Sequence, residues 1–269
     1  MGQALGELRG SAGRRRALGQ NFLVDPEVVS RTIEAAGIAE GQAVLEIGPG
    51  QGILTRGLLA AGARVHAVEI DSRLADALKG EDLAGLTLLE GDFLKIDLGV
   101  LPDSPLLVVA NLPYATGTAI VERLLASPER FPRIVVMLQK EVAARLAAEP
   151  GSRSYGSLSV LTALWARSSM LFEVPPSSFR PRPKVDSAVV RLDVSARPRA
   201  PVSDPGLFRD VVRAAFAQRR KMLRNTLRAS FGESGLLALD RAGIDERRRA
   251  ETLTLEEFAS LTHEVAALA

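Results

Sequence analysis

The chain of 269 residues contains no cysteine, one tryptophan, two tyrosines and two histidines. Without cysteine it forms no disulfide, holds no cysteine-ligated iron–sulfur cluster and has no thiol nucleophile. The two histidines, His66 and His263, are far apart in sequence, which argues against a histidine-based metal site. We therefore expect a protein without a metal centre.

The chain also lacks long hydrophobic runs. No stretch of roughly 18 apolar residues occurs, so no membrane span is expected. The first residues are basic and polar where a secretory signal has an apolar core, and this favours a cytoplasmic protein, with an Arg-rich transit peptide as the alternative. The net charge of +2 says little about partners, so the distribution of charge along the chain matters more.

The most informative stretch that is present covers residues 44–55, with the sequence VLEIGPGQGILT. A buried-strand pattern is followed by Gly48, Gly50 and Gly52, and then by an apolar run with helical spacing. Strand, glycine turn and helix form the first unit of an α/β nucleotide-binding sheet, and the glycines permit positive φ and close approach of a ligand. The G-x-G-x-G spacing differs from the dinucleotide G-x-G-x-x-G and favours a ligand without a pyrophosphate. A plain structural turn is the alternative.

Two carboxylates follow at informative distances. Glu69 stands about twenty residues after the glycines and directly after the apolar run 65–68, where a carboxylate meets a ribose diol. S-adenosylmethionine has a ribose and an adenine but no phosphate, so it fits both features. Asp92 follows the next strand-like run at its carboxyl end, where an α/β sheet keeps its ligand groups.

Strand-like and helix-like segments alternate along the first two thirds of the chain. Asp25 and Pro26 predict the start of a helix that ends at Gly37. Strands are expected over 44–47, 64–68, 86–89, 106–110, 134–138, 168–172 and 187–192, and further helices over 71–78, 118–125 and 140–148. This alternation predicts a Rossmann-like α/β fold with a mostly parallel sheet and helices on both faces.

The composition divides the chain into four parts. Residues 1–16 form a basic tail, 17–194 the sheet domain, 195–205 a linker rich in Pro, Ser and Arg, and 206–269 a small all-α domain. The tail is either a solvated arm or an arm for nucleic-acid phosphates.

A single helix expected over 207–228 carries many cations and one acid, Asp210. Its seven basic residues are Arg209, Arg213, Arg219, Arg220, Lys221, Arg224 and Arg228. We interpret this face as a phosphate-binding wall for RNA, formed chiefly by Arg219, Arg220, Lys221 and Arg224. A merely solvated surface is the alternative.

The motif NLPY, residues 111–114, follows the strand expected at 106–110. The exocyclic amine of adenine is a poor nucleophile, because its lone pair is delocalised into the ring. Acceptors for its N–H bonds, the Asn111 side chain and a backbone carbonyl next to Pro113, would draw the nitrogen toward a tetrahedral geometry. Tyr114 would stack on a flipped base.

Phe179, in a loop rich in proline and basic residues, is the candidate for the other face of the base. Ordinary packing roles are the alternatives for both motifs.

Taken together, seven motifs resemble the small-subunit ribosomal RNA adenine dimethyltransferase family. LGQNFL, VLEIGPGQGILT, VEID, GDFLKID, NLPY, FRPRPKVDSAVVRL and AFAQRRKMLRNTL occur in that order over roughly residues 15–230. The resemblance implies that the chain transfers methyl groups from S-adenosylmethionine to N6 of two adjacent adenosines near the 3′ end of the rRNA. It implies a target-base site at Asn111, Leu112, Pro113, Tyr114 and Phe179. The expected cofactor residues are Asn21, Leu23, Gly48, Gly50, Glu69, Ile70, Asp92, Phe93 and Asn111.

Three other functions share parts of this pattern. One is a large-subunit rRNA adenine methyltransferase of the macrolide-resistance type, and another is a non-catalytic nucleic-acid-binding relative. The third is an NAD-dependent oxidoreductase, against which the glycine spacing and NLPY argue. The partner expected from the resemblance is small-subunit rRNA within a pre-ribosomal 30S-type particle, bound by a monomer with a role in small-subunit biogenesis.

Overall fold

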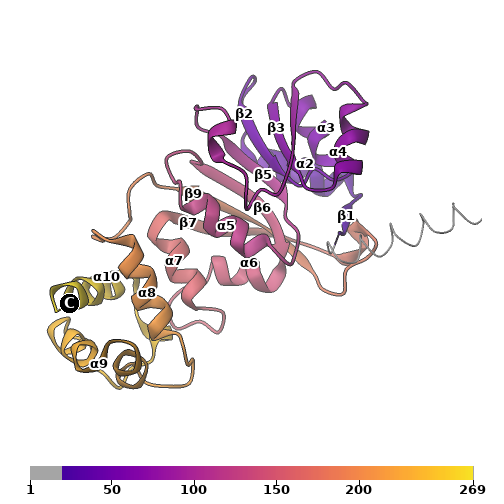
Figure 1. The fold of residues 1–269 in the computed structure, drawn as a ribbon. Coiled ribbons are helices and arrows are strands. Elements are labelled where there is room, and N and C mark those ends of the chain that lie inside the picture. The colour runs from indigo at the N-terminus through magenta and orange to yellow at the C-terminus, as the bar shows by residue number, and fades with distance from the viewer. Residues whose placement is uncertain (1–19, 269) are drawn as a thin grey trace, which may run out of the picture. The chain divides into compact units, whose positions relative to one another are not determined.

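The computed structural model describes residues 20–268, which divide into two compact units (Figure 1). Within these residues, unit 1 comprises 20–143 and 169–194, and unit 2 comprises 144–168 and 195–268. The basic tail 1–16 lies outside the described residues. No helix of the described part is long and apolar enough to cross a membrane.

The core of unit 1 is a seven-stranded sheet in the order β4-β3-β2-β5-β6-β9-β7. Its strands are β2 (Ala43–Ile47), β3 (Arg64–Glu69), β4 (Leu86–Glu90), β5 (Leu107–Asn111), β6 (Arg133–Gln139), β7 (Ala166–Val174) and β9 (Ser187–Val194). Strands β2 to β6 run parallel, and β9 is antiparallel to β6. The chain builds outward from β2 to β4 and then returns to β5 and β6. The strand order therefore reverses between β2 and β5, and such a sheet opens a crevice at the carboxyl ends of these strands.

Five helices connect the strands of unit 1. They are α2 (Pro26–Ala36), α3 (Ile53–Ala60), α4 (Ser72–Lys79), α5 (Gly117–Leu125) and α6 (Lys140–Leu146), with a short 3₁₀ turn, η1 (Leu98–Val100). Helix α2 begins and ends as predicted, because Asp25 accepts a hydrogen bond from the Glu27 amide, Pro26 occupies the first turn and Gly37 has a φ of 61°.

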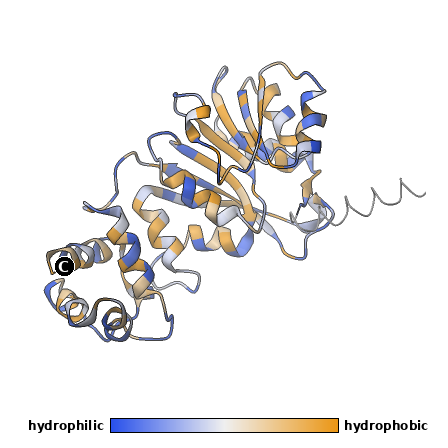
Figure 2. Cartoon of the chain, in the orientation of Figure 1, coloured by the Kyte–Doolittle hydropathy of each residue, from blue (hydrophilic) through white to orange (hydrophobic). Residues whose placement is uncertain are grey.

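Opposite faces of the sheet carry different helices. Val44, Val65 and Val109 point from alternate strand positions into one core that also contains apolar residues of α2 and α3. On β6, Val135 and Met137 point into this core, so the side chain of Leu138 points to the opposite face. That side chain packs against Gly117 of α5, where an added Cβ would meet it at 2.4 Å. Helix α5 therefore covers the opposite face (Figure 1). Figure 2 shows the strands mostly in the hydrophobic colour, as a sheet covered on both faces requires.

A two-residue ribbon secures the start of the described chain. β1 (Phe22–Leu23) pairs antiparallel with β8 (Phe179–Arg180), which follows the 3₁₀ turn η2 (Pro176–Ser178). The Ser178 hydroxyl donates to the Asp25 carboxylate over 2.8 Å, and this bond lowers the pKa of Asp25. Residues 20–23 are thereby held in place by a segment more than 150 positions away in sequence.

Unit 2 is helical and has its own core. It contains α7 (Ser157–Trp165), α8 (Pro205–Ala215), α9 (Leu223–Arg241), η3 (Ala250–Thr252) and α10 (Leu255–Ala267). Val160 and Leu164 of α7 belong to the same buried cluster as Phe208 and Phe258. Residues 144–168, which the sequence assigned to the sheet domain, thus pack with the C-terminal helices. Helix α7 was not predicted, because its sequence is apolar nearly all round and shows no polar face.

The predicted linker 195–205 also differs from a free connection. The Arg199 amide donates to the Leu164 carbonyl over 2.8 Å, its guanidinium donates to the Ala163 carbonyl over 2.9 Å, and Ala200 is buried. The segment is therefore fixed along α7, within unit 2.

The prediction of one helix over 207–228 is wrong. Helix α8 ends at Ala215, residues 216–222 form turns, and α9 begins at Leu223 and kinks at Gly232. Tertiary bonds start α9, because the Leu223 amide donates to the Arg248 carbonyl and the Arg224 amide donates to the Glu246 carbonyl. The expected helices over 236–242 and 255–268 lie in the second half of α9 and in α10.

Candidate active site

A cavity of about 220 Å³ opens at the carboxyl ends of the central strands of unit 1. Its main lining comes from segments 20–23, 46–51, 68–70, 91–94 and 111–116. Four of these segments end or follow a parallel strand, and the fifth is the chain around β1. The crevice predicted from the strand order is therefore present, and it gathers residues from five separate motifs.

The glycine turn after β2 forms one wall of the cavity. Gly48, Gly50 and Gly52 have φ angles of 70°, 58° and 76°, so all three adopt the positive φ that glycine permits. A Cβ added to Gly48 would meet no atom within 4 Å, so bare backbone faces open space there. The Phe22 ring lies 3.2 Å from the corresponding point at Gly50 and closes the turn on that side.

Glu69 ends β3 and holds the glycine turn in place. Its side chain is buried, with Oε2 accepting from the Gly50 amide at 3.0 Å and Oε1 accepting from the Asp71 amide at 2.9 Å. Burial raises the pKa of Glu69, and the backbone amides oppose that rise. Each carboxylate oxygen keeps acceptor capacity, so the fixed group can receive two hydroxyls of a ligand.

Glu46 also lines the cavity, although its place within a buried-strand pattern does not mark it as a site residue. Its side chain is 1% exposed and accepts a hydrogen bond from the Thr55 hydroxyl over 2.7 Å. Burial raises its pKa to about 8, and the nearby Glu69 contributes to the rise. The signal that could have identified it is a single carboxylate within an otherwise apolar strand.

The loop after β4 contributes Asp92 and Phe93. The Leu94 amide donates to Asp92 Oδ1 over 3.0 Å, and Lys95 lies 3.7 Å from the other carboxylate oxygen. Arg123 of α5 donates to two carbonyls of this loop and stacks over the Phe93 ring, with 5.7 Å between the guanidinium carbon and the ring centre. The loop is thus fixed to a helix before any ligand binds.

Asn111 is the last residue of β5 and faces the chain around β1. Its amide nitrogen donates to the Asn21 carbonyl over 3.4 Å, which leaves the amide oxygen as its acceptor. The Pro113 carbonyl accepts from the amides of Thr116 and Gly117 at 3.2 and 2.8 Å. Because the Pro113 carbonyl already accepts these two hydrogen bonds, the Leu112 carbonyl is the better second acceptor for the N–H groups of an adenine amine.

Tyr114 is partly buried on the cavity wall. Its hydroxyl lies 2.6 Å from the hydroxyl oxygen of Ser187. Ser187 is the first residue of β9 and is fully buried. Burial raises the pKa of Tyr114, and the bond to Ser187 opposes the rise. Ser187 was not among the predicted site residues. It lies 73 positions from Tyr114 in sequence, and only the antiparallel pairing of β9 with β6 brings the two together.

The remaining predicted cofactor residues all line the cavity, whereas Phe179, which was predicted for the target base, does not. Asn21, Leu23 and Ile70 line it, and Ile70 is 51% exposed. Phe179 is 0% exposed and packs in the core beneath α2. The reason is its place in β8, where it stands opposite Leu23, so the expected second face for a base is absent from the cavity wall.

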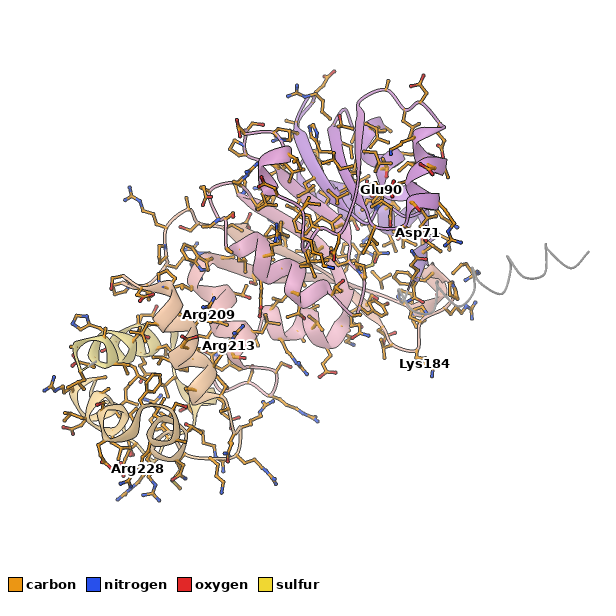
Figure 3. The ribbon with its side chains drawn as sticks, viewed as in Figure 1. Asp71, Glu90, Lys184, Arg209, Arg213 and Arg228 are labelled. Atoms are coloured by element: carbon orange, nitrogen blue, oxygen red, sulfur yellow. The ribbon has the colours of Figure 1, made fainter. Side chains whose placement is uncertain are left out.

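The four predicted RNA-binding cations lie in unit 2 and differ in their partners. Arg219 pairs with Glu251 over 3.3 Å and donates to the Arg153 carbonyl, and Arg224 lies 3.7 Å from Glu246. Within residues 20–268, Arg220 and Lys221 are exposed and make no ion pair. Arg209 and Arg213 are four residues apart on α8 and share a face, as expected (Figure 3).

Comparison with known proteins identifies the class and then the family. The Rossmann-like sheet is that of S-adenosylmethionine-dependent methyltransferases. Among solved structures, a dimethyladenosine transferase from Plasmodium falciparum superposes with a TM-score of 0.77, at 27% identity, covering 92% of this chain and 98% of that chain. The 23S rRNA methyltransferase ErmE gives a TM-score of 0.70 at 29% identity, with 91% and 100% covered.

Sequence comparison gives the family. The profile of the ribosomal RNA adenine dimethylases matches residues 12–267. A Syntrophotalea carbinolica protein named ribosomal RNA small subunit methyltransferase A is 48% identical, with 92% of this chain and 95% of that protein covered. A Geobacter sulfurreducens protein of the same name is 47% identical, with 95% and 96% covered. The chain belongs to the ribosomal RNA adenine dimethylase family. It is a methyltransferase with S-adenosylmethionine as its cofactor, and the resemblance found in the motifs is confirmed.

Proposed function

We propose that the protein dimethylates N6 of two adjacent adenosines near the 3′ end of small-subunit rRNA. The observation that supports this most is that Asn111, Leu112 and Tyr114 line the same cavity as the glycine turn and Glu69. Groups suited to a nucleoside cofactor and groups suited to an adenine amine thus share one space. The names of the 47–48% identical relatives support the small subunit as the substrate.

The cofactor-binding groups divide by chemistry. When bound, S-adenosylmethionine supplies a methyl group on a sulfonium. Glu69 accepts hydrogen bonds from the two ribose hydroxyls, because its carboxylate is already oriented by Gly50 and Asp71. Asp92 accepts from the adenine amino group, and Ile70 offers apolar surface to the ring. The remaining contacts proposed are Asn21, Leu23, Gly48, Phe93 and Asn111.

Asn111 and Leu112 act on the target amine. The Asn111 amide oxygen and the Leu112 carbonyl oxygen accept hydrogen bonds from the two N–H groups of the amine. These bonds draw the nitrogen toward a tetrahedral geometry, in which its lone pair points at the methyl group. Holding the amine, the methyl carbon and the sulfur in line is then the main contribution of the protein. No general base is needed before transfer, because the proton becomes acidic once the nitrogen carries the added methyl, and it then passes to water.

Tyr114 supplies one face for the flipped base. The bond to Ser187 fixes its hydroxyl, and Pro113 limits the backbone next to it. Phe179 is left out of the proposed base site, because its ring is buried in the core.

Unit 2 supplies phosphate contacts, whereas the reacting groups lie in unit 1. Arg220 and Lys221 are the strongest candidates, because their charges are not neutralised by acids of the described chain. Arg219 and Arg224 already pair with Glu251 and Glu246. In this proposal the protein is a monomer that acts in the cytoplasm on a pre-ribosomal 30S-type particle and contributes to small-subunit biogenesis.

The test uses labelled S-adenosylmethionine with unmethylated small and large ribosomal subunits, followed by mapping of the modified nucleotides. We expect label only in small-subunit rRNA, on two adjacent adenosines near the 3′ end, as dimethyladenosine. Label in large-subunit rRNA would favour the activity in the name of the structural relative ErmE. A protein that binds the subunit and transfers no methyl would overturn the proposal.

A further inference from the structure

Residues 180–186, with the sequence RPRPKVD, comprise the last residue of β8 and the loop that leads to β9, and we call this segment the basic loop. It carries Arg180, Arg182 and Lys184 within five positions, and its one acid is Asp186. Pro181 and Pro183 restrict the backbone between the cations. None of the functions assigned above uses this loop.

Both ends of the basic loop are attached to walls of the active-site cavity. At one end Arg180 stands opposite Phe22 in the β1–β8 ribbon, and Phe22 lines the cavity. At the other end, Ser187 contacts the Tyr114 hydroxyl, and the Asp186 carbonyl accepts from the Lys140 amide over 2.9 Å. The loop therefore runs beside the cavity on the side of the proposed target base. Lys184 is labelled on it in Figure 3.

The charge of the loop contrasts with that of its unit. The described residues of unit 1 contain 14 Lys and Arg against 20 Asp and Glu, a formal charge of −6. Neighbouring cations are neutralised, as Lys140 at the start of α6 is by Glu173 over 2.8 Å and Arg191 of β9 is by Asp193 over 2.9 Å. Within residues 20–268, Arg182 and Lys184 are exposed and form no ion pair, so a local positive patch stands on an acidic unit.

We propose that the basic loop binds the phosphates of the RNA strand that presents the target adenosine, with Arg182 and Lys184 each meeting one phosphate. The inference rests on the proposed function, because it takes the ligand of the cavity to be a base of that strand. A nucleotide flipped into the cavity brings its flanking phosphates to the rim, where an acidic unit would otherwise repel them. Such contacts position the strand and read no sequence.

The test compares two charge-matched variants of the full chain. Arg182→Gln with Lys184→Gln removes the free cations of the loop. Arg64→Gln with Lys79→Gln removes the same charge from the first residue of β3 and the last residue of α4, away from the carboxyl ends of the strands that form the cavity. Binding to unmethylated small subunits is measured across a salt series, together with affinity for S-adenosylmethionine and steady-state methyl transfer.

We expect the loop variant to flatten the plot of log affinity against log salt by about 1.4, since each single-strand phosphate contributes about 0.7. Its KM for subunits should rise while its kcat and its cofactor affinity stay unchanged, and the control variant should match wild type. An unchanged slope, or an equal loss in the control, would overturn the assignment, as would lost cofactor binding. The binding measurement needs no turnover, so it decides the loop even if wild type proved to transfer no methyl, which would refute the proposed function instead.

Discussion

At the scale of single residues, the site depends on polar groups whose orientation is set by backbone amides. Glu69 is the clearest case, because two amides hold its carboxylate before any ligand arrives. Its place at the cavity was predictable from its distance to the glycine turn. The places of Glu46 and Ser187 were not predictable. A strand pattern does not show that the Glu46 side chain faces a cavity. It also does not show that Ser187 contacts Tyr114, which lies 73 positions away in sequence.

Replacing Glu69 with Ala should weaken S-adenosylmethionine binding by about ten- to a hundred-fold. The lost charge-assisted hydrogen bonds are worth roughly 1.5–3 kcal/mol. The matched control is Glu90→Ala, since Glu90 is paired with Glu69 in the β3–β4 register and is exposed (Figure 3). Calorimetry measures both affinities, and equal affinities for wild type and the Glu69→Ala variant would show that this carboxylate does not bind the ribose.

Glu46 predicts a pH dependence of stability in the ligand-free protein. Its pKa is about 8 in the folded chain and 4.5 as the reference for the unfolded chain. Between these values the unfolded state has lost the proton that the folded state keeps, so stability falls as pH rises, by up to about 1.4 kcal/mol per pH unit. We expect Glu46→Gln to remove this decline when denaturant unfolding is compared at pH 5 and pH 8. A stability gap between the two proteins that does not change with pH would contradict the assignment.

The Tyr114–Ser187 bond should matter for orientation of the base site rather than for folding. Tyr114→Phe and Ser187→Ala each remove the 2.6 Å contact, so each should cost about 0.5–1.5 kcal/mol in kcat/KM. The double variant should be no worse than the worse single variant, because both changes remove one interaction. Additive losses in kcat/KM would show that the two hydroxyls act separately.

At the scale of elements, local signals were predictable and long-range ones were not. The start and end of α2 follow from Asp25, Pro26 and Gly37, which act within the helix itself. The break between α8 and α9 was missed because Phe216 and Leu223 are seven residues apart and continue the helical phase. Phe216 is the C-cap of α8, and its ring makes a tertiary contact that the sequence does not show, because it stacks on Phe258 with 5.9 Å between ring centres.

The turn between α8 and α9 gives a second phosphate-binding prediction. Changing Arg220 and Lys221 together to Glu should weaken small-subunit binding and flatten its salt dependence, while cofactor affinity stays unchanged because the cavity lies in unit 1. Filter binding across a salt series measures the slope. The same charge change at the exposed Arg197 and Arg241 is the control. A slope that stays at the wild-type value would refute the phosphate-binding role of this turn.

At the scale of the whole molecule, charge is divided between the two units. The described residues of unit 2 contain 16 Lys and Arg against 11 Asp and Glu, a formal charge of +5, whereas unit 1 has −6. The net charge of +2 conceals this division. The sequence indicated only the cations of the C-terminal helices, and it did not indicate that unit 1 is acidic. An acidic catalytic unit that carries one basic loop, together with a basic helical unit, suits an enzyme that holds RNA by phosphates and admits one base to its chemistry.

In the proposed reaction, Asn111 acts directly on the target nitrogen. The most direct test is single-turnover methyl transfer to unmethylated small subunits by wild type and Asn111→Ala, with S-adenosylmethionine and subunits both saturating. We predict that the rate falls by roughly 10²–10³-fold, as for loss of one preoriented polar group at a reacting centre, while subunit affinity stays unchanged and cofactor affinity falls much less. A normal single-turnover rate, or a rate loss no larger than the loss of cofactor affinity, would contradict the account.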